Sequence, residues 1–180
     1  YNKPYKTSGV ELDHNSQFEN ELPKGWRVCR LDEVSTIKAG GDKPKSFSES
    51  KTKEFSIPIY SNSTKNKGLF GFTNKAKIFQ SSITISARGA IIGYTELRFK
   101  PFVPIVRLIV VTPKDEMILN YLYYTIKNFR FDDLSSAQGQ LTKPDISAYQ
   151  IVIPDENSLA MFHNLSKRLF KRIICEHKEI

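Results

Sequence analysis

The strongest constraint on the fold is a series of short apolar runs, each bounded by glycine, proline or asparagine, in the middle of the chain. The runs cover residues 57–60, 77–86, 91–95 and 102–111. They are close together and rich in β-branched residues, which favours strands. The pattern therefore predicts a compact β-rich body, and it disfavours an alternation of strands and helices.

Two helical patterns follow this body. Asp115 is a capping residue before apolar positions that recur at helical spacing up to Phe129, which predicts a short amphipathic helix. From Leu159 onwards, apolar residues recur at steps of three and four, which predicts one stripe of a long helix. Between the two patterns, residues 150–153 read as a closing strand stopped by Pro154. The expected fold class is α+β: a compact coiled β-rich core, a short amphipathic helix and a long C-terminal helix.

The chain divides into three parts by composition. Residues 1–22 are polar and predict an extended lead-in with at most one helical turn, residues 23–154 form the main domain, and residues 155–180 begin the long helix. Within the main domain, residues 26–37 pair a short strand with one helical turn, and residues 39–53 form a loop. The helical pattern reaches the last residue and the first residue is Tyr1, so we expect a piece of a longer protein.

Positive charge is concentrated in two segments. Residues 43–77 hold eight lysines against Glu49 and Glu54, a net charge of +6, although the whole chain carries only +8. Residues 167–178 carry a further +4. Clustering of this kind favours a polyanionic partner such as nucleic acid. A lysine-rich face that merely interacts with water is the alternative.

The sequence offers no catalytic or metal site. Asp155 and the Glu176-His177-Lys178 segment superficially fit a restriction nuclease pattern, but Glu176 and Lys178 fall within a helical stripe, where that chemistry needs a strand. Cys29 and Cys175 form no metal-ligand pair, which predicts reduced thiols in the cytoplasm. We expect no cofactor and no bound metal, and no apolar run is long enough to cross a membrane.

Several segments together resemble one known family. They are Pro-Lys-Gly-Trp at 23–26, Ile-Pro-Ile-Tyr-Ser-Asn at 57–62, Lys-Gly-Leu-Phe-Gly-Phe at 67–72, Ile-Thr-Ile-Ser-Ala-Arg-Gly-Ala-Ile-Ile-Gly at 83–93, and Pro-Phe-Val-Pro at 101–104. Tyr-Lys-Thr-Ser-Gly at 5–9 and Gly-Gln-Leu-Thr at 139–142 add to the match. In this order they resemble the target recognition domain of type I restriction-modification specificity subunits, or the equivalent domain of a fused restriction-modification enzyme, over residues 4–160.

The resemblance implies a non-catalytic domain at 23–154 that reads duplex DNA, and a spacer and docking helix from residue 155. The implied partners are duplex DNA, methyltransferase subunits and a restriction subunit. A second recognition domain, or a second copy of the chain, is a further helix partner. The start of the helix, residues 154–159, departs from the Pro-rich and Glu/Gln-rich pattern of the family, which leaves the docking partner open.

The residue types suit this function. Lysines bind phosphates, arginine can pair bidentately with guanine, and amide side chains suit adenine. The predicted DNA-binding residues are Lys43, Lys45, Asn62, Lys65, Lys67, Asn74, Lys75, Arg88, Gln138, Gln140 and Lys143. The predicted docking residues on the helix are Leu165, Leu169, Ile173 and Ile174. The structural alternatives are that Arg88 anchors a turn, that Asn62 caps one, and that the glutamines bond loop backbone.

Two other function classes compete with DNA recognition. A protein-interaction module would use the C-terminal helix, and its basic loops would only interact with water. A metal nuclease ranks last, for the reasons given above. Binding to a random duplex separates the first two classes, because an interaction module has no salt-sensitive affinity for DNA.

Overall fold

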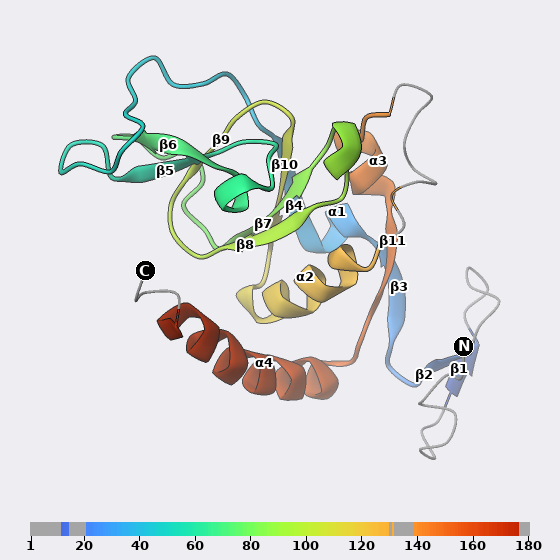
Figure 1. Cartoon of the computed structure of the whole chain (residues 1–180). Helices are drawn as coiled ribbons and strands as arrows, with labels where there is room; N and C mark the ends of the chain where they lie inside the picture. Colours follow the sequence, from blue (N-terminus) through green and yellow to red (C-terminus); the bar gives the residue numbers. More distant parts are fainter. Residues whose placement is uncertain (1–11, 15–20, 130, 132–138, 177–180) are drawn as a thin grey trace.

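The computed structural model describes residues 12–14, 21–129, 131 and 139–176, and for residues 12–14, 21 and 171–176 it describes the backbone alone. The fold is α+β, as expected. Figure 1 shows a four-stranded sheet at the centre, a three-stranded sheet on one side of it, and helices α2 and α4 on the other. The two helices form successive layers, because α2 covers the sheet and α4 packs on α2.

The central sheet is antiparallel and has the order β4-β10-β7-β8. Its strands are β4 (Ser35–Ala39), β10 (Leu108–Pro113), β7 (Ser82–Ser86) and β8 (Thr95–Arg98). All of β7 is buried, and its residues alternate between the two faces. Ile83 and Ile85 enter the main core, together with Leu122 of α2. The hydroxyls of Ser82, Thr84 and Ser86 line the opposite face.

The second sheet has the order β6-β5-β9. Its strands are β6 (Leu69–Thr73), β5 (Ile57–Tyr60) and β9 (Val103–Pro104), with β5 antiparallel to β6 and parallel to β9. Ile59 and Val103 form a small core within this sheet. Val110 of the central sheet packs with Phe102 beside it, so the two sheets are joined by apolar contact as well as by the hydroxyl face.

The remaining elements connect the layers. They are β1 (Leu12–His14), β2 (Glu21–Pro23), β3 (Arg27–Arg30), α1 (Leu31–Val34), η2 (Lys65–Gly68), η3 (Gly89–Ile91), η4 (Glu116–Ile118), α2 (Leu119–Lys127), α3 (Lys143–Ala148), β11 (Gln150–Ile153) and α4 (Glu156–Glu176). β11 pairs antiparallel with β3, which ties the end of the main domain to its beginning. Asp115 caps η4 as expected, because its side chain accepts from the Met117 N–H at 2.8 Å.

Asp155 starts α4 and fastens it to β3. Its Oδ1 accepts from the Ser158 N–H at 3.0 Å, which is an N-cap bond, and its Oδ2 accepts from Trp26 Nε1 at 3.0 Å. These bonds hold the pKa of the Asp155 carboxyl below its usual value, with the Ser158 hydroxyl as the largest cause. Asp155 and Glu176 therefore stand at opposite ends of α4, about 30 Å apart at the rise of an α-helix. The nuclease pairing is thus contradicted.

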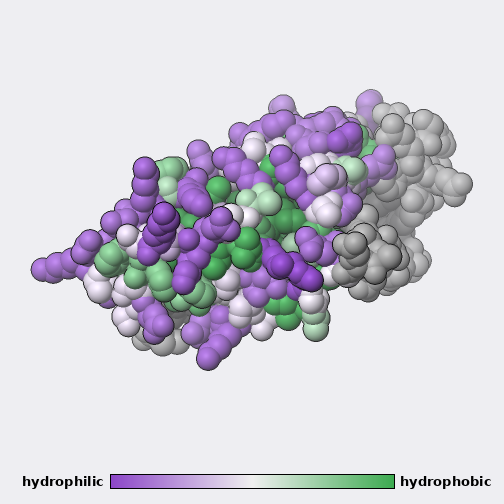
Figure 2. Space-filling model, turned by 90° about the horizontal axis from the view of Figure 1, so that it is seen from above, coloured by the Kyte–Doolittle hydropathy of each residue, from purple (hydrophilic) through white to green (hydrophobic). Residues whose placement is uncertain are grey.

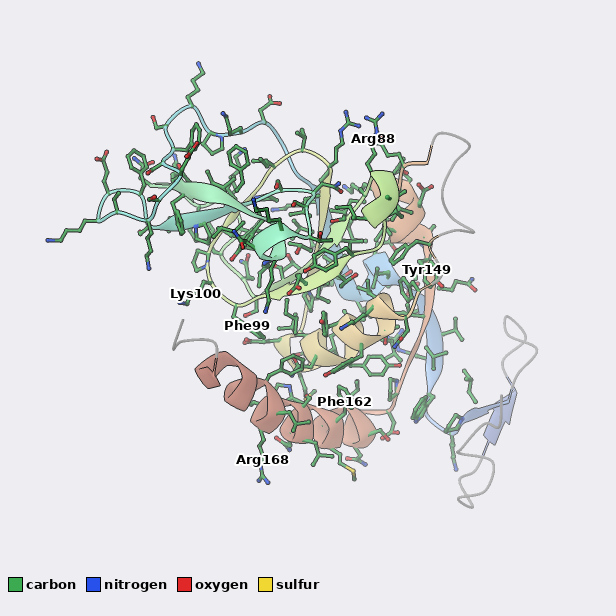
Figure 3. All side chains as sticks on the ribbon, viewed as in Figure 1. Arg88, Phe99, Lys100, Tyr149, Phe162 and Arg168 are labelled. Carbon is green, nitrogen blue, oxygen red and sulfur yellow. The ribbon has the colours of Figure 1, made fainter. Side chains whose placement is uncertain are left out.

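α4 has two apolar faces where the sequence predicts one stripe. Phe162 and Phe170 face α2 and pack against Tyr124 (Figure 3). The buried Ser166 accepts a hydrogen bond from Asn120 Nδ2 of α2 at 2.9 Å. On the outer face, Met161, Leu165 and Leu169 are exposed by 67%, 59% and 62%. The side chains of Ile173 and Ile174 lie outside the described residues.

Three sequence predictions about the elements are wrong in detail. Residues 91–95 are not one strand, because η3 ends at Ile91, residues 92–94 form a turn, and β8 begins only at Thr95. The run 102–111 is two strands, β9 and β10, separated by a turn. The run 77–86 forms a strand only from Ser82 onwards. Near the start of the chain, the extended residues 12–14 pair antiparallel with residues 21–23. Most of residues 1–22 lie outside the described part. In addition, α3 was not predicted, and its Thr142–Asp145 capping box explains why it forms.

Candidate nucleic-acid interface

Asn62, just after β5, braces the loop that carries Arg88. Its Oδ1 accepts from the Ala87 N–H at 2.9 Å and from the Arg88 N–H at 3.3 Å. Its Nδ2 donates to the Arg88 carbonyl at 3.0 Å. The amide that the sequence analysis assigns to adenine thus faces protein backbone, which is the structural alternative for this residue. Asn62 fixes the direction in which the Arg88 loop leaves the sheet.

Two more segments meet this loop at the same end of the central sheet. The Leu141 N–H donates to the Ala87 carbonyl at 2.8 Å, and Arg88 and Gln140 form an isolated antiparallel bridge. The Ala87 N–H also donates to the Arg107 carbonyl at 3.0 Å. Four segments distant in sequence therefore converge on Ala87. Their side chains at 88 and 107 are exposed, and Figure 3 shows Arg88 pointing away from the body.

Arg107 is the functional candidate that the sequence analysis missed. Its Nη1 donates to Gln140 Oε1 at 3.4 Å, so its side chain lies beside one of the predicted DNA-binding residues. A hollow of about 440 Å³ opens next to this pair. Arg107, Gln140 and Lys143 contribute its polar lining, and Val106 and Leu108 contribute apolar lining. The available signal was an arginine that interrupts the apolar run 102–111.

A second basic group projects from η2. Lys65 and Lys67 are exposed, and Asn66 and Lys67 adopt left-handed backbone conformations, with φ of 47° and 54°. Two bonds hold this strained loop. The Ser61 N–H donates to the Gly68 carbonyl at 2.8 Å, and the buried Arg98 donates from Nη2 to the Lys67 carbonyl at 2.6 Å. Asn62 lies in the same β5–η2 connection, so this connection links the loop of the two lysines to the Arg88 loop.

The other predicted residues lie along the three-stranded sheet. Lys43 stands over the Phe47 ring, 4.2 Å from its centre, in a loop joined to β6 by a Ser48–Phe72 bridge. The remaining predicted residues with described side chains, Lys45, Asn74 and Lys75, are exposed, the last two in the turn after β6. Gln138 lies outside the described residues. In Figure 2, the face towards which Arg88 points is largely hydrophilic, with apolar patches between the polar side chains.

The exposed side chains of these loops offer hydrogen-bond donors and positive charge. Among the described residues, no group of three or more His, Cys, Asp or Glu side chains is placed to hold a metal ion. Within the same residues, no helix has the length and apolar character to span a bilayer. Exposed arginine and lysine side chains on braced loops are suited to phosphates and to base edges.

The comparisons with known proteins all match type I specificity subunits or their domains. The family model of the type I restriction modification DNA specificity domain matches residues 23–173. The Mycoplasma pneumoniae protein S.MpnORF507P, named as a type I specificity subunit, is 37% identical over 130 residues, covering 72% of this chain and 36% of that protein. The MjaIX specificity subunit of Methanocaldococcus jannaschii is 26% identical over 200 residues, covering 99% of this chain and 45% of that protein.

The fold comparison adds a solved structure. The S subunit of a type I restriction-modification system from M. genitalium superposes with a TM-score of 0.65 at 16% identity, covering 87% of this chain and 41% of that one. The chain thus spans less than half the length of each of these relatives. With a family match that covers most of its length, this chain belongs to the type I restriction-modification DNA specificity domain family.

Proposed function

We propose that the chain is a non-catalytic DNA target recognition domain, which reads part of a duplex target and brings methyltransferase and restriction subunits to it. Its place of action is the cytoplasm, where DNA is accessible and both cysteines stay reduced. Family membership supports the general role. The assignment of the DNA face to particular residues is ours.

The observation that carries the proposal is the convergence of four segments on Ala87. This brace brings together Arg88, Arg107 and Gln140, and Lys143 lines the same hollow as Arg107 and Gln140. Specific duplex recognition requires this combination, since phosphate contacts fix the register and forked side chains discriminate between bases. An interaction module has no need of it.

The test is a salt titration with a random-sequence duplex. Each phosphate contact contributes about −0.9 to the slope of log affinity against log salt, so four to six contacts give a slope of about −4 to −5. Lys65→Ala and Lys67→Ala should each reduce the slope by about one unit with no change in sequence preference. Arg168→Ala on the far side of α4 is the matched control. A flat titration would favour the interaction module instead.

We propose further that the outer face of α4 docks a partner helix. Met161, Leu165 and Leu169 follow one another at i, i+4 spacing and are each more than half exposed, which suits knobs of a helix pair. The partner is a helix of a second recognition domain, of a methyltransferase subunit, or of a second copy of this chain.

Replacing both Leu165 and Leu169 by Asp tests the docking proposal. The circular dichroism spectrum should stay unchanged, because neither side chain contributes to the core. Self-association by light scattering, or co-purification with a methyltransferase subunit, should be lost. The matched control is Phe79→Asp, which changes a similarly exposed apolar side chain outside α4. If the double variant associates as the unmodified chain does, the outer face is not the docking surface.

A further inference from the structure

Arg107 occupies a backbone conformation that its residue type disfavours. Its φ is 71°, in the left-handed region, at the third position of the turn Ile105–Val106–Arg107–Leu108, which the Leu108 N–H closes on the Ile105 carbonyl at 3.3 Å. Turns with positive φ at this position normally use Gly or Asn, which adopt it with little or no steric cost. Such an outlier points to a use for the side chain.

Within the part of the chain that the structure describes, the fold gives this side chain one use only, a bond to Gln140. The turn is held by main-chain bonds, since the Arg107 carbonyl receives the Ala87 N–H and the Gly40 N–H reaches the Leu108 carbonyl at 2.7 Å. The guanidinium is exposed, and its bond to Gln140 is 3.4 Å long. An exposed bond of this length adds little stability. A glycine would complete the same turn.

The position of the guanidinium fits base recognition. It stands at the convergence on Ala87, beside the exposed Arg88 and at the edge of the hollow that Lys143 also lines. Main-chain bonds hold the turn that carries Arg107 and the segment that carries Gln140, and Gln140 Oε1 accepts one N–H of the fork. The turn and this contact together direct the fork, and other N–H groups remain for the O6 and N7 acceptors of a guanine. Lys143 can hold the phosphate next to that base.

We propose that Arg107 is a specificity-determining residue that reads one guanine in the major groove of the target, with Gln140 as its positioning residue. This inference rests on the proposed DNA recognition and goes beyond it by assigning one base to one side chain. It also changes the expected role of Gln140, which orients the arginine and does not itself read adenine.

The experiment enriches a pool of duplex DNA with a randomised 12-base-pair window by binding to the 180-residue chain, followed by sequencing. Arg107→Asn and Arg107→Gly keep a residue that suits the turn, and Arg107→Lys keeps the charge but lacks the planar fork. Arg168→Asn is the matched control, because Arg168 points away from the body on α4. Thermal unfolding of each variant is measured in parallel.

The unmodified chain and Arg168→Asn should enrich the same motif, with one position strongly guanine. In all three Arg107 variants the preference at that position should fall about tenfold or more, while the other positions persist. Arg107→Gly should melt at or above the temperature of the unmodified chain.

Three results overturn the proposal. If the Arg107 variants keep the guanine, another residue reads it. If the variants keep the guanine and also weaken binding to every sequence alike, Arg107 contacts phosphate. If Arg107→Gly melts well below the unmodified chain, the side chain is structural. In each case the unmodified chain still enriches a motif, so DNA recognition stands. If the unmodified chain enriches no motif at all, the proposed function itself fails, and the assignment of Arg107 fails with it.

Discussion

Arg98 of β8 is a buried cation, 6% exposed, between the two sheets. Its Nε donates to Thr84 Oγ1 at 3.1 Å, its Nη2 donates to the Lys67 carbonyl, and its guanidinium carbon lies 3.6 Å from the centre of the Tyr60 ring. Burial lowers the pKa of Arg98 from its ordinary value. Arg98→Met removes all three contacts and keeps a side chain long enough to fill much of the space.

The expected loss follows from these contacts. Leaving the partly buried Lys67 carbonyl without its donor costs about 1–3 kcal/mol. Losing the contact with the Tyr60 ring costs about 1–2 kcal/mol. The Thr84 hydroxyl retains its bond to the Glu96 carbonyl, so it adds little. A buried cation is itself costly, and removing it offsets part of the loss. We expect the free energy of unfolding to fall by about 2–3 kcal/mol, or about 4–12 °C in Tm for a domain of this size.

Two measurements check this prediction. Denaturant unfolding followed by circular dichroism gives the global loss, and the exposed Arg168→Met should change it by less than about 0.5 kcal/mol. Limited trypsin digestion gives the local effect, since the released η2 loop should be cut faster after Lys65 and Lys67 in Arg98→Met. An unchanged unfolding midpoint together with an unchanged cleavage rate would refute the role of Arg98 as the support of this loop.

Three further predictions concern other parts of the fold. Burial raises the pKa of the Cys29 thiol, so its contribution to stability is complete below the ordinary thiol pKa of about 8.5 and declines as the pH rises above it. The free energy of unfolding of Cys29→Ala should therefore depend less on pH above that value. The pKa of the Asp155 carboxyl is lowered, so its contribution to folding stability is complete above about pH 4 and is lost as the pH falls through the lowered pKa. Fluorescence of Trp26, the chain's one tryptophan, should report this loss, because Trp26 donates to Asp155. Asp155→Asn should abolish the fluorescence change. A Cβ on Gly40 would lie 2.3 Å from a backbone carbonyl, so Gly40→Ala should cost about 1–3 kcal/mol in thermal unfolding, whereas Gly41→Ala, whose Cβ meets only a lysine amino group at 3.5 Å, should be tolerated.

The architecture was predictable where the chain repeats a simple period. The spacing of apolar residues after Asp115 and Leu159 indicated both helices, and β11 occupies the predicted residues 150–153. Periodicity could not reveal that α4 has two apolar faces, because residues that pack on α2 and residues that face outwards alternate within the same steps of three and four. Tertiary packing decides which apolar residues of α4 face α2, and the periodicity of one sequence does not reveal tertiary packing.

The site was less predictable because its turns lack the usual markers. Gly and Asn mark left-handed positions in sequence, so an arginine with φ of 71° at position 107 hides the break between β9 and β10. Residues 91–95 resemble a strand by composition. The chain turns at Gly93 instead, where a Cβ would lie 2.4 Å from the ring of Phe131, and this contact is with a residue 38 positions further along the chain. Distant contacts also decide the role of Asn62, whose amide bonds to backbone 25 and 26 residues further along the chain.

The convergence on Ala87 also bears on how such a protein changes over evolutionary time. Among the described residues, main-chain atoms of residues 87, 107 and 141 and the side chain of Asn62 make the short bonds that join its segments, and the long bond between Arg107 and Gln140 adds little to them. Side chains at 88, 107 and 140 can therefore mutate without disturbing the loops that carry them. If these side chains read the target as proposed above, one or two substitutions at these positions would change the target, whereas loss of Asn62 would impair every target alike. The bonds of the brace thus keep the loops in place while the side chains that the loops carry are free to vary.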